Sequence, residues 1–334
     1  MELNTKLSKI ILFTLHIFGL WPNGKSPTSL KLYKFYSYAI HFTFSLMFLM
    51  CMVLNYETIG SIHKETEALF PTITVLSYCL KVVNFYLNAS GMQRTFVDVM
   101  QFEFKNDNEI RMTNDKLRYL YRFSMCFILT AHFTMVSTFM RVLFISGPAE
   151  LPLPSWYPID WKNNQKLYWI VYSYQTLGAF LILNVNLTLD LYLIFLMAII
   201  CKHLETVGDR LANLTANHRN ITPHTRCLDV VEQSRMNDEL IDCIKVHQNL
   251  IRTIDAVERN FTFGSFCLIS LSGVITCCAA YTLTILSPIA DSVRFVYCLA
   301  FFITSILEIF MISYFGEQIL TASSLLTFQA YSTS

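Results

Sequence analysis

The feature that most constrains this chain is an apolar run of 34 residues, from 167 to 200, in which Asp190 is the only charged residue. As an α-helix it would be about 51 Å long, at 1.5 Å per residue. The hydrocarbon core of a bilayer is only ~30 Å thick. The helix must therefore tilt, or leave the membrane and remain buried in protein. Residues 201–214 favour a continuing helix, because they are polar but keep apolar residues at helical spacing.

The composition places the rest of the chain in a membrane as well. Hydrophobic residues make up 54% of the sequence and charged residues 15%, with a mean hydropathy of +0.43. Soluble domains carry about 25% charged residues. The net charge of +1 is spread without a basic stripe, so no nucleic-acid partner is expected. The cysteines and histidines show no metal-binding spacing, so neither a metal nor a cofactor is expected.

We predict an all-α, polytopic helical bundle that forms a single membrane domain. Its six spans are expected at residues 36–56, 68–89, 121–146, 167–200, 261–286 and 294–315. Residues 1–35 are interpreted as an N-terminal segment with an interfacial helix, which is favoured over a signal peptide because no small-residue cleavage site follows its apolar part. Residues 201–260 are predicted to form a helical anchor region outside the membrane. Residues 316–334 hold no further span.

The distribution of positive charge predicts the orientation. Eighteen Lys and Arg residues fall before the first span, between the second and third, and between the fourth and fifth, against four in the other connections. Cytosolic loops carry the excess of Lys and Arg. The N-terminus, the anchor region and the segment after the sixth span are therefore expected in the cytosol.

Three charged residues within the spans attract attention, because a charge at membrane depth is costly and is usually paired or functional. Lys81 and Glu308 lie ~20 and ~21 Å below the outer ends of the second and sixth spans, so they would be level with each other. Two hypotheses stay open: the two pair, or Glu308 is protonated or hydrated in a crevice. Asp190 would lie ~35 Å down its helix, near the inner interface, where a structural role is favoured over ion coordination.

A ligand layer is predicted by the same depth argument. Aromatic, hydroxyl and amide side chains lie at or next to a level roughly 10–15 Å below the outer ends of four spans. These candidate ligand-binding residues are Tyr78, Ser137, Thr138, Tyr172, Gln175, Tyr297 and Phe301. Such a set suits a small, mostly apolar molecule. The alternative is that these residues simply pack helices together. The histidines within the spans have no catalytic partner in the sequence, so no enzyme is expected.

Several short motifs together resemble one known family, the insect odorant receptors. The motifs fall at residues 19–22 (GLWP), 156–158 (WYP), 172–175 (YSYQ), 203–211 (HLE through RL), 314–317 (YFGE), 322–325 (ASSL) and 330–332 (AYS). Each motif is degenerate, but their order along the whole chain and the cytosolic N-terminus match the family's pattern.

This resemblance implies an odorant-binding subunit that assembles with an obligate co-receptor into a tetrameric, odorant-gated cation channel of olfactory neurons. It implies a plasma-membrane location and a small hydrophobic volatile ligand, bound in the outer half among the second, third, fourth and sixth spans. The family has a seventh, pore-lining span, whereas this sequence ends at Ser334, where that span should begin. We therefore expect a truncated form without the pore helix.

Three other membrane classes are considered. A gustatory receptor shares the topology, but its C-terminal signature differs from the region of Tyr331. A G-protein-coupled receptor would have the opposite charge bias and commonly a disulfide to an outer loop. A transporter would show inverted repeats with broken helices near the midplane, and glycine and proline are sparse in these spans.

Overall fold

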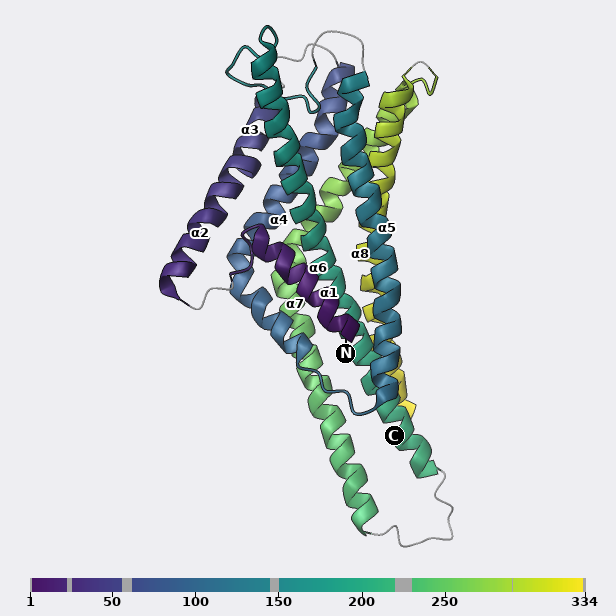
Figure 1. The fold of residues 1–334 in the computed structure, drawn as a ribbon. Coiled ribbons are helices and arrows are strands. Elements are labelled where there is room, and N and C mark those ends of the chain that lie inside the picture. The colour runs from purple at the N-terminus through teal and green to yellow at the C-terminus, as the bar shows by residue number, and fades with distance from the viewer. Residues whose placement is uncertain are drawn as a thin grey trace.

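The computed structural model describes residues 2–22, 26–55, 62–144, 150–219, 230–289 and 291–332 as a bundle of long helices (Figure 1). The five longest are α4 (Ile62–Met100), α5 (Asp107–Phe144), α6 (Gln165–Arg219), α7 (Val230–Ile285) and α8 (Ser292–Ser332). Within the described residues, six helical stretches are long and apolar enough to cross a membrane. The prediction of an all-helical membrane bundle is confirmed. We call the end that carries residues 150–164, at the top of Figure 1, the upper end, and the opposite end the lower end.

The first apolar stretch is one continuous helical rod built from three segments. It consists of α2 (Pro27–His41), a π-helical turn η1 (Phe42–Leu46) and α3 (Met47–Leu54). Pro27 suits the start of α2, because the first turn of a helix needs no backbone N–H donor there. The rod stands to one side of the bundle (Figure 1), and much of its apolar surface is exposed, as expected for a face that meets lipid.

Helices α4 to α8 are longer than the apolar runs within them. α6 has 55 residues and α7 has 56, so each would extend for roughly 80 Å, well beyond a bilayer. α4 continues to Met100 and α5 begins at Asp107, which reduces the polar stretch of residues 91–120 to a short connection. Hydropathy marks where a helix leaves lipid, not where it ends. The sequence also predicts a break in the helix at residues 215–223; α6 instead continues to Arg219, and the rest of that stretch lies outside the described residues.

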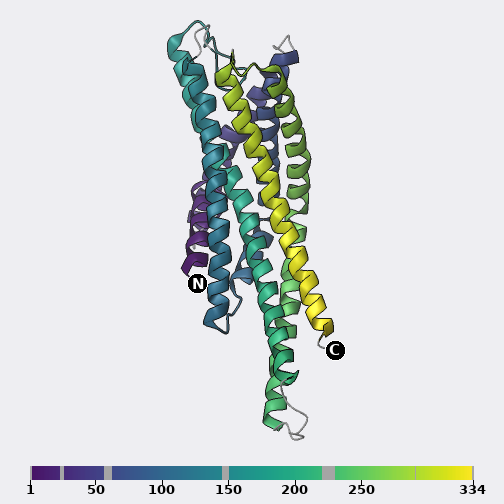
Figure 2. The same ribbon diagram turned by 90° about the vertical axis from the view of Figure 1, so that its right-hand side faces the viewer.

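α6 is the central helix of the bundle and touches α1 (Glu2–Ile17), α4, α5, α7 and α8. Figure 2 shows α8 running beside α6 toward the lower end, where the C-terminus lies. The most extensive helix pair is α4 with α7. Gly91 permits that approach, because a Cβ there would lie 2.6 Å from the side-chain oxygen of Asn260. Asn260 in turn donates to Thr95 at 3.2 Å.

The motif at residues 19–22 has a structural explanation. Gly19 has a φ of +83°, a conformation that residues with a side chain rarely adopt, and it turns the chain after α1. The turn delivers Trp21 into the core, where its ring lies 5.9 Å from Phe96 and 6.2 Å from Tyr192. The motif therefore fastens the N-terminal helix to α4 and α6.

Candidate functional site

A partly open cavity lies in the upper half of the bundle, among α4, α5, α6, α7 and α8. It has a volume of about 150 Å³. Its walls are mainly aliphatic and aromatic, with Leu153 of the upper loop covering one side. The lining residues include Phe127, Ala131, Thr138, Phe139, Ile182, Leu183, Ile275, Tyr297 and Phe301.

The hydroxyl groups of the cavity wall have hydrogen-bond partners within the protein. Thr138 donates to the backbone oxygen of Thr134 at 2.8 Å, and Ser305 donates to that of Phe301 at 3.0 Å. The hydroxyls of Thr134 and Thr304 lie 3.1 Å apart and link α5 to α8. Because a hydroxyl that bonds back to its own helix offers little to a ligand, the wall behaves as a largely apolar surface.

The floor of the cavity is polar and charged. Glu308 of α8 and Asn186 of α6 both line it, and both also contact Lys81 of α4. The Lys81 ammonium lies 2.9 Å from the Asn186 side-chain oxygen, 2.9 Å from a Glu308 oxygen and 2.7 Å from an Asp190 oxygen. We call Lys81, Asp190 and Glu308 the ion cluster. It joins α4, α6 and α8 at one point.

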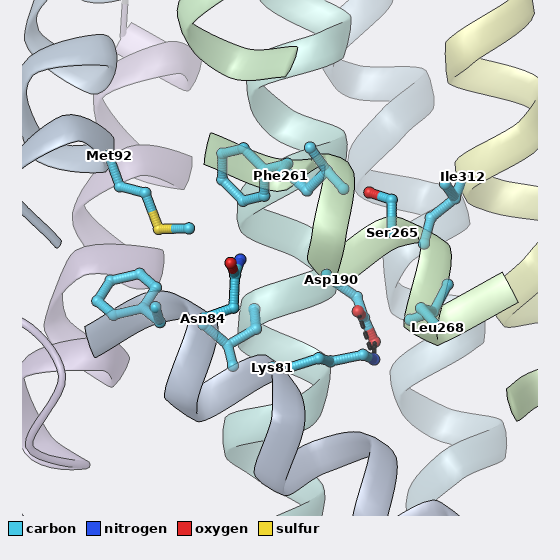
Figure 3. A pocket seen from close by; sticks show the side chains of 12 residues that line it. Lys81, Asn84, Met92, Asp190, Phe261, Ser265, Leu268 and Ile312 are labelled. Atoms are coloured by element: carbon cyan, nitrogen blue, oxygen red, sulfur yellow. Dashed lines mark hydrogen bonds and ion pairs between the residues drawn. The ribbon is translucent and has the colours of Figure 1, made fainter. Parts of the chain in front are cut away.

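A second, smaller void of about 40 Å³ lies against the ion cluster, next to α7. Lys81 and Asp190 line this void together with Asn84, Ser265 and other residues (Figure 3). Figure 3 shows the Lys81 side chain meeting the Asp190 carboxylate, with Ser265 and Leu268 of α7 nearby. Glu308 lines the larger cavity and Asp190 the smaller one. The ion cluster therefore stands between the two.

The structure places Lys81 and Glu308 as an ion pair, which is the first of the two hypotheses drawn from their depths. It also brings Asp190 into the same cluster, although the depth calculation put Asp190 much lower. That calculation assumed that the spans start at a common level and run parallel. α4 instead begins at Ile62, before the predicted start of the second span, so Lys81 lies farther down its helix than the calculation assumed. The α6 helix also crosses the bundle at a tilt, which brings Asp190 higher (Figure 1).

Three of the seven predicted ligand-layer residues line the cavity: Thr138, Tyr297 and Phe301. The other four lie at nearby levels but on other faces. Ser137 is partly buried on α5 beside Thr138. The Tyr78 hydroxyl is directed toward the rod, 2.8 Å from the Ser45 hydroxyl and 3.0 Å from a ring nitrogen of His41.

Tyr172 and Gln175 organise the upper end rather than the cavity wall. The Tyr172 hydroxyl donates to the backbone oxygen of Phe139 at 3.2 Å. The buried amide of Gln175 bonds both to the backbone N–H of Leu153, at 3.2 Å, and to its carbonyl, at 2.9 Å. Since Leu153 lines the cavity, Gln175 holds part of its cover in place. The depth of a residue along its helix predicts its level in the membrane. The direction of its side chain depends on how the helix is rotated about its own axis, and the sequence pattern did not determine that rotation.

Arg141 of α5 contacts the same upper loop, at the residue before Leu153. Its guanidinium donates to the carbonyl of Pro152 at 3.2 Å and lies 5.1 Å from the centre of the Tyr297 ring. The cavity thus has an arginine beyond one end and a glutamate at the other, with apolar walls between them.

Long apolar helices around a largely apolar cavity define the class of multi-pass membrane proteins, and a cavity of this kind is suited to a small molecule. The sequence profile described as "7tm Odorant receptor" matches residues 61–334. The chain belongs to this odorant receptor family, as its motifs suggested. The match favours an odorant receptor over the gustatory receptor, the G-protein-coupled receptor and the transporter, and the family is one of receptors.

Curated relatives and solved structures agree with this assignment. The chain is similar to Odorant receptor 94a of Drosophila melanogaster, with 24% identity over 98% of this chain and 82% of the relative. It is also similar to Odorant receptor Or1 of Anopheles gambiae, with 20% identity over 92% and 77%.

The fold is similar to that of the insect olfactory receptor OR5 from Machilis hrabei. The TM-score is 0.81 at 17% identity, covering 96% of this chain and 81% of that one. The structure of the same receptor in complex with eugenol gives a TM-score of 0.78, covering 98% and 89%.

Proposed function

We propose that this chain is the ligand-binding subunit of an odorant-gated cation channel, and that the cavity among α4 to α8 is its odorant site. The observation that carries the proposal is the mostly apolar cavity of about 150 Å³ in the upper half of the bundle. A cavity of about that size in an apolar core accepts a benzene-sized molecule. Volatile odorants are small and mostly apolar, so size and lining agree.

The relatives support the same assignment. The solved Machilis receptor has been captured with eugenol, a small aromatic odorant. Family resemblance supports assembly with the olfactory co-receptor in the plasma membrane of olfactory sensory neurons. The excess of Lys and Arg in the connections at the lower end supports a cytosolic lower end. The cavity would then lie toward the outside, where odorants arrive.

Filling the cavity tests the proposal. Ala131 of α5 lines it and is almost fully buried, so Ala131→Phe places a ring inside the space a ligand would need. Val136, on the same helix, is 52% exposed on the outer face of the bundle, and Val136→Phe is the matched control. A version that continues through the family's seventh span is expressed with the co-receptor, and cation currents are recorded over an odorant panel at matched surface expression.

We expect Ala131→Phe to raise the concentration for half-maximal response by about tenfold or more, because a ligand would have to displace the new ring from the space that it occupies. Val136→Phe should respond like the unmodified chain. Equal responses of Ala131→Phe and the unmodified chain, at equal surface expression, would show that odorants bind elsewhere.

A further inference from the structure

The ion cluster at the cavity floor contains one more carboxylate than it has ammonium groups. Lys81 pairs with Asp190 at 2.7 Å and with Glu308 at 2.9 Å, so two acids share one base. The Lys81 and Asp190 side chains are 7% and 5% exposed, and that of Glu308 is 16% exposed. Asn186 adds a neutral amide to the cluster. With all three groups ionised the cluster would carry one unbalanced negative charge, so it is balanced when one of its two carboxyl groups holds a proton.

That imbalance is unfavourable in this environment. A buried charge is stable when it is paired and fully hydrogen-bonded, and an unpaired one at membrane depth is costly. A ligand that brings a positive charge can take the place of that proton, and it would therefore be bound more strongly here than a ligand that brings none.

The geometry presents Glu308 to that ligand. Glu308 is the most exposed of the three side chains, and it lines the odorant cavity, whereas Asp190 faces the smaller void. The walls above it include aromatic residues, among them Phe127, Tyr297 and Phe301. These suit a ring or a short hydrocarbon chain, and their faces also attract cations. Arg141, beyond Tyr297 at the other end, would repel a cation there.

We propose that the cavity selects protonated primary amines with a small aromatic or aliphatic body. The ammonium group donates to the Glu308 carboxylate at the floor, and the hydrocarbon part fills the apolar space between Phe127 and Tyr297. A neutral alcohol of the same shape can donate one hydrogen bond but adds no charge. A carboxylic acid meets Glu308 with a like charge when ionised. This inference rests on the proposed function and specifies the ligand class of the same cavity.

Three probes of matched size test the selection: toluene, benzyl alcohol and benzylamine, which is protonated at neutral pH. The full chain in lipid nanodiscs is titrated with each probe by calorimetry. Hydrogen bonds to charged groups contribute about 1.5–3 kcal/mol, so benzylamine should bind roughly tenfold to hundredfold more tightly than toluene. Benzyl alcohol should fall between them.

The variant Glu308→Gln should remove the preference for benzylamine while toluene still binds, which also shows that the variant is folded. Glu317→Gln, at an exposed position on the same helix, is the matched control and should keep the preference. If Glu308→Gln does not fold, Glu308→Asp keeps the charge and should keep the preference.

Two results would overturn the inference, and they differ in what they leave standing. If toluene binds the unmodified chain as tightly as benzylamine does, amine selection is wrong but the cavity remains a ligand site. If none of the three probes binds, the amine inference fails together with the assignment of the cavity as a ligand site.

Discussion

The upper and lower halves of α6 are covered in different ways. Between residues 165 and 186, buried and exposed positions alternate with the helical period, and apolar side chains such as Ile170 and Leu177 are 62% exposed. Every residue from 192 to 204 is buried. The same helix therefore has one covered face near the upper end and is enclosed on all sides lower down.

This difference separates two mechanical roles. In the upper half the helices border a cavity on one side and expose apolar faces on the other, so we expect their packing to adjust to what the cavity holds. In the lower half α1, α4, α5, α7 and α8 surround α6, with Tyr192, Phe195 and Leu196 fully buried. Closely packed helices move as units. The ion cluster lies near the junction of the two halves.

The largest effect is expected from removing the base of the ion cluster. Lys81→Met leaves the carboxylates of Asp190 and Glu308 buried without their shared partner. Breaking a buried ion pair from one side costs about 3–5 kcal/mol. The unfolding midpoint of the chain in nanodiscs should fall accordingly, relative to Lys105→Met, whose side chain is 45% exposed. Equal midpoints for the two variants would mean that the cluster does not hold the halves together.

A matched pair of substitutions on α6 compares the two halves directly. Leu196→Ala empties a fully buried position and should lower the free energy of unfolding by about 2–5 kcal/mol. Leu183→Ala removes the same atoms from a side chain that already faces the cavity, so the loss should be smaller. Because Leu183→Ala enlarges the cavity, this variant should also respond to bulkier odorants. The free energy of unfolding of both variants is measured in nanodiscs. Equal losses at the two positions would mean that the upper and lower halves of α6 are packed alike.

Particular residues show how far the sequence can predict this molecule. The hydropathy of residues 167–200 and of the other runs was enough for the helical class and the number of spans, because lipid accepts few alternatives to helices. Their depths along the second and sixth spans were enough to predict that Lys81 and Glu308 lie level with each other. The addition of Asp190 depends on the tilt of α6, and the exclusion of Tyr78 from the cavity depends on helix rotation. Tilt and rotation are set by packing between helices that are distant in sequence, which no local pattern encodes.

The lower half is also tied by polar contacts, beyond the apolar runs of the helices. Arg210 of α6 donates two hydrogen bonds to the Glu109 carboxylate at the start of α5, at 2.9 and 2.8 Å, and a third to the backbone oxygen of Glu103. Partial burial raises the pKa of Glu109, but the hydrogen bonds from Arg210 and from the Lys105 amide outweigh it. The pKa of Glu109 is therefore held below its ordinary value.

The smallest expected effect is a pH dependence that belongs to the lower half. A carboxyl whose pKa is depressed by folding stabilises the protein above its unfolded pKa, about 4.3 for Glu, and loses that contribution as the pH falls through the folded value. Glu109→Gln should therefore cost about 1 kcal/mol at neutral pH, and the difference from the unmodified chain should shrink on acidification below that pKa. Unfolding in nanodiscs across this range measures both. If the difference stays constant with pH, the charge of Glu109 does not stabilise the lower half, and apolar packing alone accounts for its stability.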